Sequence, residues 1–302
     1  MAGPVAGDVA GSPLGREQDY AGGYDPSRLY PIARADSRST LAAAPARGFH
    51  GVDWWTAFEL SWLDGEGRPQ IAVGRFAVPA DSPCIVESKS LKLYLGGLYN
   101  VAYERWAALE AVLAADLSAA TRAPVGVTLE SLDAFEARGF DRFLGTCVDS
   151  APLRQDAGLL AAEGQATAPV RQRFHSHLLR SLCPVTGQPD WGSVELLFEG
   201  PELDPAGVLA LVLAQREHNG FHEATVERLY AALEALPGAA YVAVRAAYCR
   251  RGGIDITPCR ASAPTPRRDT TWPTCPAFPA IDAKAPPPSP PRAQPPPPRR
   301  DD

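Results

Sequence analysis

The fold is indicated first by residues 55–78, which read WTAFELSWLDGEGRPQIAVGRFAV. Two runs rich in apolar, β-branched and aromatic residues, 55–63 and 69–78, flank the turn Asp64-Gly65-Glu66-Gly67. A glycine-containing turn between two such runs is typical of a β-hairpin. The stretch therefore predicts two strands that pair with each other.

Downstream of this hairpin, the spacing of apolar residues changes to that of a helix. Residues 90–119 place charged side chains such as Glu110 between apolar ones such as Leu109 and Leu113, which predicts one long helical stretch. Residues 124–130 then predict another strand.

A second half repeats this order of elements. It is predicted to contain strands at 171–182 and 192–200, helices at 205–217 and 223–236, and a closing strand at 240–248. Residues 104–111 also resemble residues 227–235, which favours a tandem duplication. The expected class is α+β, in which each half is an antiparallel sheet with helices packed on one face. We expect the halves to span residues 24–150 and 151–260.

The ends of the chain differ from these halves in composition. Residues 1–23 are rich in glycine and alanine without periodicity, and we expect them to be mobile. Residues 261–302 include Pro286–Pro288 and Pro295–Pro298, a composition that is expected to be extended or disordered. A proline-rich partner motif is an alternative interpretation of this tail.

Charge and hydropathy restrict the class of partner. The 302-residue chain has a formal net charge of -6 and a pI of about 5.5, which disfavours a nucleic-acid partner. No apolar run reaches the roughly 20 residues of a membrane-spanning helix, and residues 1–17 do not resemble a secretory signal. A cytosolic enzyme acting on a small molecule is therefore expected, without a membrane partner.

The six cysteines do not form a CxxC pair, so a structural zinc site is not predicted. One of them, Cys183, lies in the segment Cys183-Pro184-Val185-Thr186-Gly187-Gln188-Pro189-Asp190, where two prolines and a glycine predict a shaped loop. If the loop folds back, Asp190 could serve as the base that a cysteine nucleophile needs. A buried cysteine beside a turn aspartate is the alternative.

Three further segments carry polar residues at element boundaries. Glu87-Ser88-Lys89-Ser90-Leu91-Lys92 joins a strand to a helix, where Ser88 or Ser90 could cap the helix and free N–H groups could attract phosphate. An ordinary capped helix start with two solvated lysines explains the same residues.

Phe221-His222-Glu223 begins a later helix, and its carboxylate could accept two hydrogen bonds from a guanine-like edge. A glutamate favoured by the helix dipole, beside a structural histidine, is the alternative. Arg250-Arg251-Gly252-Gly253 suits close approach to a phosphate, or forms a plain turn. Neither a GxGxxG fingerprint nor a GxxxxGK loop is present in the sequence.

Taken together and in this order, the four segments resemble the long, two-domain form of the 7-cyano-7-deazaguanine reductase family. The likeness runs from about residue 24 to residue 260 and includes Tyr30-Pro31-Ile32-Ala33-Arg34. The sequence departs from the family in its proline-rich tail and at Cys259, where the family tends to have tryptophan.

The resemblance implies two tandem tunnelling folds and a homodimer. It also implies NADPH-dependent reduction of a nitrile to an amine, with a free base as the substrate and a product used in queuosine synthesis. It implies Cys183 as the nucleophile that forms a thioimide and Asp190 as general acid and base. The implied substrate-binding residues are Val86, Glu87, Ser88, His222 and Glu223. The implied NADPH-binding residues are Ser88, Lys89, Arg251 and Gly252, and no metal is required.

Two other functions remain open from the sequence. A tunnelling-fold cyclohydrolase acting on GTP would use zinc held by cysteine and histidine, and His175 and His177 are the nearest histidines to Cys183 in sequence. A non-catalytic purine-binding or scaffold protein would leave Cys183 no more reactive than the other cysteines.

Overall fold

The predicted hairpin at 55–78 is present and is longer than expected. In the computed structural model, which describes residues 23–138, 142–154 and 168–263, β2 (His50–Leu63) pairs antiparallel with β3 (Pro69–Pro79). The register shifts between Ala57 and Leu60, which marks a bulge in β2. The expected mobile N-terminus and proline-rich tail lie almost entirely outside the described residues.

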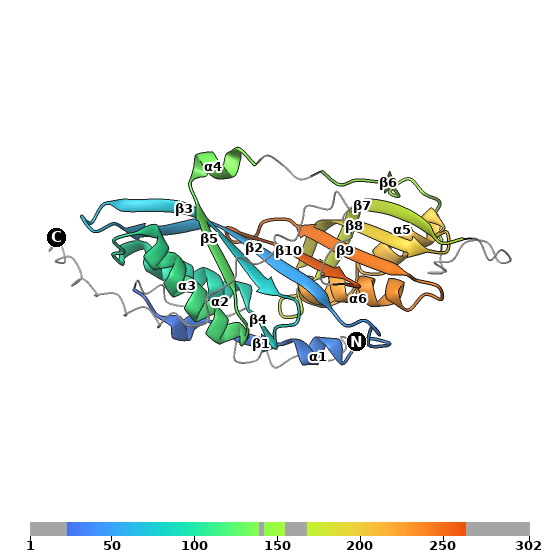
Figure 1. Cartoon of the computed structure of the whole chain (residues 1–302), viewed down its shortest axis with the longest axis horizontal. Helices are drawn as coiled ribbons and strands as arrows, with labels where there is room; N and C mark the ends of the chain where they lie inside the picture. Colours follow the sequence, from blue (N-terminus) through green and yellow to red (C-terminus); the bar gives the residue numbers. More distant parts are fainter. Residues whose placement is uncertain (1–22, 139–141, 155–167, 264–302) are drawn as a thin grey trace.

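The remaining strands complete a larger sheet and a small two-stranded one. They are β1 (Pro31–Ala33), β4 (Cys84–Val86), β5 (Gly126–Glu130), β6 (Thr146–Cys147), β7 (Val170–Leu182), β8 (Pro189–Gly200), β9 (Tyr241–Tyr248) and β10 (Ile254–Ala261). The larger sheet has the order β5-β3-β2-β10-β9-β8-β7-β6, and β1 pairs with β4. Every described pair is antiparallel except β6 with β7. The halves are thus joined edge to edge in one sheet (Figure 1).

The described α-helices are α1 (Arg34–Arg38), α2 (Ser88–Gly96), α3 (Trp106–Thr121), α4 (Leu132–Glu136), α5 (Pro205–Leu213) and α6 (His222–Glu234). Figure 1 shows α2 and α3 beside the part of the sheet that contains β2, β3 and β5, and α6 beside the part that contains β9 and β10. An α+β protein built from antiparallel strands with packed helices was predicted, and this class is confirmed. None of the helices in the described residues is long and apolar enough to cross a membrane.

The prediction of one helix over residues 90–119 is wrong. The chain forms α2, a 3-10 turn (Gly97–Asn100) and then α3. Two adjacent glycines, Gly96 and Gly97, weaken the helix at this point. Residues 101–103 then run beside the end of β2, where Tyr103 N–H donates to the Leu63 carbonyl at 2.8 Å. The helix expected at 205–217 also ends early, at Leu213.

The last strand, β10, was not predicted, because Pro258 within it argues against a strand. It pairs with β2 over eight positions, from Ile254 with Ala57 to Ala261 with His50, but with β9 over only three. A strand at the end of the second half in sequence therefore pairs mainly with the sheet of the first half. This pairing places β10, the last strand of the described residues, beside β2 of the hairpin.

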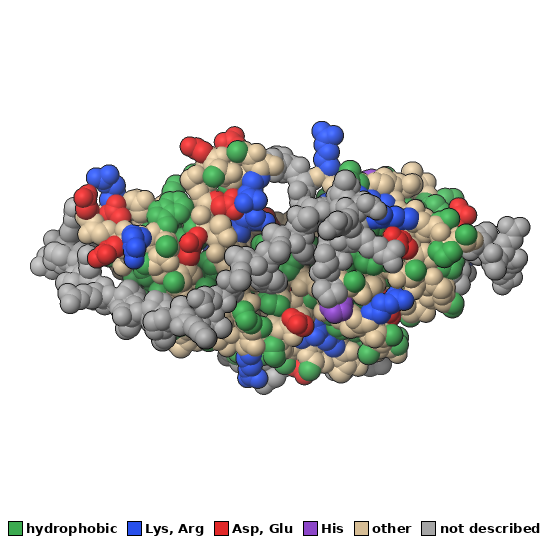
Figure 2. All heavy atoms as spheres, viewed as in Figure 1, with side chains coloured by type: hydrophobic (Ala, Val, Ile, Leu, Met, Phe, Trp, Pro, Cys, Tyr) green, Lys and Arg blue, Asp and Glu red, His purple; other side chains and the backbone are tan. Residues whose placement is uncertain are grey.

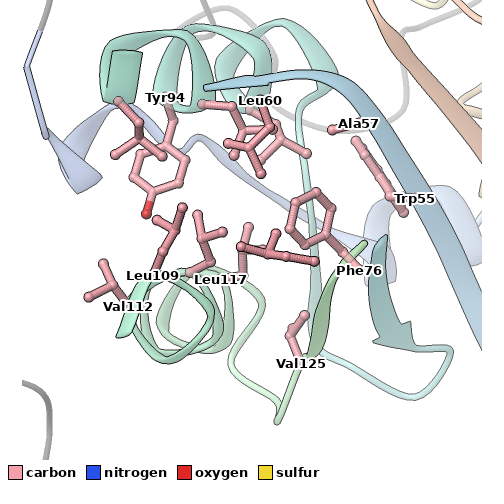
Figure 3. Packing of buried hydrophobic residues seen from close by; sticks show 14 of the residues in the cluster. Trp55, Ala57, Leu60, Phe76, Tyr94, Leu109, Val112, Leu117 and Val125 are labelled. Atoms are coloured by element: carbon pink, nitrogen blue, oxygen red, sulfur yellow. The ribbon is translucent and has the colours of Figure 1, made fainter. Parts of the chain in front are cut away.

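Each half has its own hydrophobic core. In the first, Trp55 and Phe76 from the hairpin face Tyr94 from α2 and Leu109 from α3 (Figure 3). The second core lies between β7–β9 and the helices α5 and α6. Because Ile254 and Ile256 of β10 belong to the first core, burial of apolar surface couples the two halves.

On the face drawn in Figure 2, basic and acidic side chains of the described residues are interspersed with apolar ones. They do not gather into one basic band there. This distribution agrees with the acidic net charge and with the expectation of a small-molecule partner.

Candidate active site

The predicted cysteine loop is a tight turn between β7 and β8. Cys183 N–H donates to the Gln188 carbonyl at 2.8 Å, and Gly187 N–H donates to the Cys183 carbonyl at 2.9 Å. Gly187 has φ +65°, a backbone conformation that favours glycine. Asp190 was expected within the loop but is the second residue of β8, opposite Ser181 of β7. The turn returns the chain as predicted, and both Cys183 and Asp190 line one cavity.

This cavity, called the central cavity below, has a volume of about 260 Å³ and lies where the two halves meet. Its lining comes from both halves: Trp55, Ile85, Val86, Ser88, Lys89, Lys92, Cys183, Pro184, Asp190, Phe221, His222, Glu223, Arg251, Gly252, Ile254 and Ile256. Of the predicted site residues, Glu87 alone does not line it. Four segments that are far apart in sequence thus converge on one hollow.

Glu87 serves the local structure of α2. Its carboxylate caps the helix by accepting hydrogen bonds from the backbone N–H groups of Lys89 at 2.7 Å and Ser90 at 2.8 Å. The expectation that Ser88 or Ser90 caps this helix is therefore wrong. Because Glu87 takes these two N–H groups, they are not free to bind a phosphate.

His222 is the first residue of α6 and lies against Tyr248, with ring centroids 3.8 Å apart and planes 7° from parallel. Its Nε2 is 3.4 Å from Asp190 Oδ2. Burial lowers the pKa of His222 to about 4, against the opposing charge of Glu223. The imidazole is accordingly neutral near pH 7, and its Nδ1 has no hydrogen-bond partner among the described residues.

Glu223 is buried and lines the central cavity, yet its Oε1 has no hydrogen-bond partner among the described residues. Burial raises the pKa of Glu223 to about 6, and the negative charge of Asp53 adds to this effect. A buried carboxylate oxygen without a donor is costly. It therefore suits a ligand that brings its own N–H donors.

The turn between β9 and β10 brings a positive charge to Asp190. Gly252 and Gly253 have φ +57° and +78°, as a two-residue hairpin turn with two left-handed positions requires. Arg251 forms an ion pair with Asp190 and donates to Gln188 Oε1 at 3.0 Å. The other arginine of this segment, Arg250, stacks over the Phe58 ring at 4.1 Å and is not part of the cavity lining.

The apolar part of the lining was missed from the sequence. Trp55 of β2 and Ile254 and Ile256 of β10 line the cavity and belong to the first core. The alternation Ile254-Asp255-Ile256-Thr257 is a period-2 signal that could have indicated a strand with both isoleucines on one face.

Comparison with known proteins places this geometry in a family. A family model described as nitrile reductase, 7-cyano-7-deazaguanine-reductase N-term, matches residues 20–129, and one described as QueF-like protein matches residues 189–266. A relative named NADPH-dependent 7-cyano-7-deazaguanine reductase, from Burkholderia orbicola (strain MC0-3), is 45% identical over 264 residues, covering 85% of this chain and 96% of its own length. The chain belongs to the 7-cyano-7-deazaguanine reductase family.

Relatives of the same name in this family come from other bacteria. The protein from Burkholderia cenocepacia (strain HI2424) is also 45% identical, with the same coverage. The protein from Paraburkholderia xenovorans (strain LB400) is 44% identical over 263 residues, covering 85% of this chain and 96% of its own length. Among solved structures, the archaeosine synthase QueF-Like in the apo form matches with a TM-score of 0.29 and 20% identity, covering 34% of this chain and 100% of its own.

Membership of the reductase family confirms the resemblance seen in the sequence. The zinc-dependent alternative receives no support from the site geometry. His175 and His177 lie on β7, and their ring nitrogens contact the Leu144 carbonyl at 3.3 Å and Ser193 Oγ at 2.8 Å. Neither histidine is part of the cavity lining.

Proposed function

We propose that this protein reduces the nitrile of 7-cyano-7-deazaguanine to the primary amine 7-aminomethyl-7-deazaguanine with NADPH, in queuosine biosynthesis. The proposal rests on family membership together with one observation. The central cavity contains both a cysteine–aspartate pair and a buried carboxylate whose Oε1 has no donor, namely Cys183, Asp190 and Glu223. Its volume of about 260 Å³, just below the roughly 300–1,000 Å³ usual for ligand pockets, suits a base-sized molecule.

In this proposal Glu223 accepts two hydrogen bonds from the ring N–H and amino group of the deazaguanine. Both donors would go to an ionised carboxylate, which gives stronger hydrogen bonds than a neutral acceptor. His222 lies beside it as a neutral ring, and Val86 and Ser88 complete the contacts. Glu87 contributes by holding this start of α2 in place.

Cys183 is proposed as the nucleophile. Its sulfur adds to the nitrile carbon while a proton reaches the nitrogen, which gives a neutral covalent thioimide. Asp190 would take the thiol proton and deliver it to that nitrogen, a type of transfer that typically contributes about 10²–10⁴ in rate. Asp190, which forms an ion pair with Arg251, would accept this proton as the carboxylate.

After the first reduction the carbon–sulfur bond breaks, Cys183 leaves as thiolate and an imine remains. Asp190 would return a proton to the Cys183 thiolate at this stage. In the final step it would give a proton to the amine nitrogen. When bound, NADPH supplies one hydride to the former nitrile carbon in each of the two reductions. The complete reaction consumes two NADPH and two protons.

The side chains around the cavity fit a phosphate-bearing cofactor. Lys89, Lys92 and Arg251 line it. At Gly252, a Cβ would stand 3.2 Å from Lys92 Cδ, so a larger residue would crowd this cation. We propose that Ser88, Lys89, Arg251 and Gly252 hold NADPH, chiefly through side-chain charge.

We further propose a homodimer in the cytoplasm, made of chains with two tunnelling-fold halves at 24–150 and 151–260. The two separate core clusters support the division into halves. In the described residues β5 is an outermost strand, and an open sheet edge favours pairing with a second chain. The five described cysteines are free thiols, as in a reducing compartment.

The decisive experiment is intact-protein mass spectrometry after incubation with 7-cyano-7-deazaguanine without NADPH. We expect an adduct of one substrate mass on the wild type that NADPH discharges, and none on Cys183→Ala. Cys249→Ala, which removes an exposed free thiol, is the matched control and is expected to form the adduct. NADPH oxidation without any adduct would refute the thioimide route, and the absence of both would refute the reductase assignment.

A further inference from the structure

A second, much smaller cavity lies on another side of Glu223. Its volume is about 10 Å³, and its lining is Ile32, Ala33, Arg34, Ser37, Ile85, Phe221, Glu223, Ala224 and Glu227. Ile85, Phe221 and Glu223 line both this rear cavity and the central cavity, so they form the wall between the two. A volume of this size accommodates about one water molecule.

Two unpartnered polar atoms belong to residues that line the rear cavity. Arg34 Nη1 and Glu223 Oε1 are both buried without a hydrogen-bond partner in the described part of the chain. Each residue is only 3% exposed. Buried polar atoms of this kind are generally satisfied by protein or by ordered water. A guanidinium N–H donor and a carboxylate acceptor are the two complementary groups that one water can bridge.

The rest of the Arg34 guanidinium is already held in place. Its Nη2 donates to Asp53 Oδ2 at 2.6 Å, and its Nε donates to Ser82 Oγ at 3.1 Å. Nη1 is 3.9 Å from Glu227 Oε1, which is too far for a hydrogen bond. Asp53 and Glu227 are in turn shared with Arg260, which is also buried. The guanidinium is therefore a rigid donor behind Glu223.

We propose that one water in the rear cavity accepts a hydrogen bond from Arg34 Nη1 and donates one to Glu223 Oε1, which makes Arg34 a positioning residue for the substrate-binding carboxylate. Each carboxylate oxygen can accept two hydrogen bonds, so Oε1 can bind this water and a ligand donor together. The inference rests on the proposed function of Glu223. It adds a residue outside the central cavity to the groups that determine substrate affinity.

The proposal has an electrostatic consequence. Asp53 on β2 opposes ionisation of Glu223, whereas Arg34 on α1 favours it. His222 on α6 would favour it only when protonated, and it is neutral near pH 7. Other charged or titratable groups around Glu223 are Glu227 on α6, Arg260 on β10, Tyr248 on β9, and the cavity residues Asp190, Arg251 and Lys89. Loss of the Arg34 charge should therefore make Glu223 harder to ionise. As the pH is lowered, substrate binding should then be lost at a higher pH than in the wild type.

The test compares Arg34→Met with Arg38→Gln in steady-state NADPH oxidation with 7-cyano-7-deazaguanine. Arg38 also pairs with Glu227, at 2.8 Å, but does not line the rear cavity. We expect Arg34→Met to raise KM about tenfold with kcat within about twofold, and to move the acid limb of kcat/KM upward by about one pH unit. Arg38→Gln is expected to leave that limb unmoved, and Arg34→Lys to restore it in part.

Ala224→Val keeps every charge and fills the rear cavity, so it tests the water if Arg34→Met does not fold. We expect KM to rise about threefold or more without a change in kcat. An unchanged KM in this variant, or equal effects of Arg34→Met and Arg38→Gln, would overturn the inference. An inactive wild type would instead refute the proposed function, so the two failures are distinguishable.

Discussion

The N-terminal ends of two helices, α2 and α6, lie at the central cavity, and each carries a buried glutamate. One of them lines the cavity and the other lies next to residues that line it. At the start of α2, Glu87 is 1% exposed and accepts hydrogen bonds from two N–H groups of its own helix. At the start of α6, Glu223 is 3% exposed, and its Oε1 has no partner among the described residues. The same residue type, as the N-cap of α2 and as the second residue of α6, therefore has two different environments.

The difference shows how a helix start can serve structure or ligand binding. Burial raises the pKa of both carboxyls, but the backbone donors of Lys89 and Ser90 counteract it at Glu87. At Glu223 burial outweighs a single backbone hydrogen bond, Oε1 has no partner among the described residues, and the pKa rises to about 6. A carboxylate already satisfied by its helix stabilises the fold, whereas an unsatisfied one gains most from a ligand that donates.

The largest expected effect separates the two glutamates in catalysis. Glu223→Ala removes both proposed acceptors of the substrate, and two hydrogen bonds to a charged group are worth about 3 kcal/mol or more. We expect kcat/KM for 7-cyano-7-deazaguanine to fall at least about 10²-fold, measured by NADPH oxidation. Glu87→Gln, the matched control, should change kcat/KM by less than about tenfold. Equal losses in both variants would contradict the division of roles.

A smaller effect concerns the pH dependence of stability. The pKa of Glu223 is raised from 4.5 to about 6 in the folded protein. The neutral carboxyl therefore makes its full contribution to the free energy of unfolding below pH 4.5, and this contribution is lost as the pH rises through about 6. A shift of this size corresponds to about 2 kcal/mol at pH 8. Glu223→Gln should therefore raise the free energy of unfolding by about that amount at pH 8 and have little effect at pH 4.

Urea unfolding of both proteins at pH 4 and pH 8 measures this difference. Glu66→Gln, on the exposed β2–β3 turn, is the control and should stay within about 0.5 kcal/mol of wild type at both pH values. A Glu223→Gln variant that is less stable than wild type at pH 8 would show that the carboxylate has partners in the free protein.

The smallest expected effect concerns the cap of α2. Glu87→Ala removes the acceptor of two backbone N–H groups, and loss of such a cap typically costs about 1 kcal/mol. The free energy of unfolding should fall by about 1–2 kcal/mol in urea unfolding at pH 7. Glu87→Asp, whose shorter side chain can also cap, should recover part of it. No loss in Glu87→Ala would mean that Glu87 is not needed for the structure and is available to the substrate.

Much of the fold was predictable from local pattern. The β2–β3 hairpin, β7, β8, β9 and the helix α6 were found within a few residues of their ends, because apolar periodicity reports which face of an element is buried. The failures lie where tertiary contacts oppose local preference. β10 forms despite Pro258 because β2 offers it eight paired positions. α2 ends at Gly96 because two adjacent glycines weaken the helix there and residues 101–103 are held beside β2.

The site was predictable as a set of residues but not as an arrangement. The family resemblance singled out Cys183, Asp190, His222, Glu223 and Arg251, and the structure brings all five to one cavity. It did not indicate that Glu87 caps its own helix, or that Trp55 and two isoleucines of β10 form part of the lining.

By itself the sequence determined the class of fold, the tandem order of elements and the chemical groups available for reaction. These follow from composition, periodicity and motif identity, which are local properties of the chain. Tertiary structure alone decided which carboxylate is satisfied, which cation faces Asp190 and what lies behind Glu223. The reason is that desolvation and hydrogen-bond satisfaction depend on neighbours from β2, α1, β10 and α6, which only the folded chain brings together.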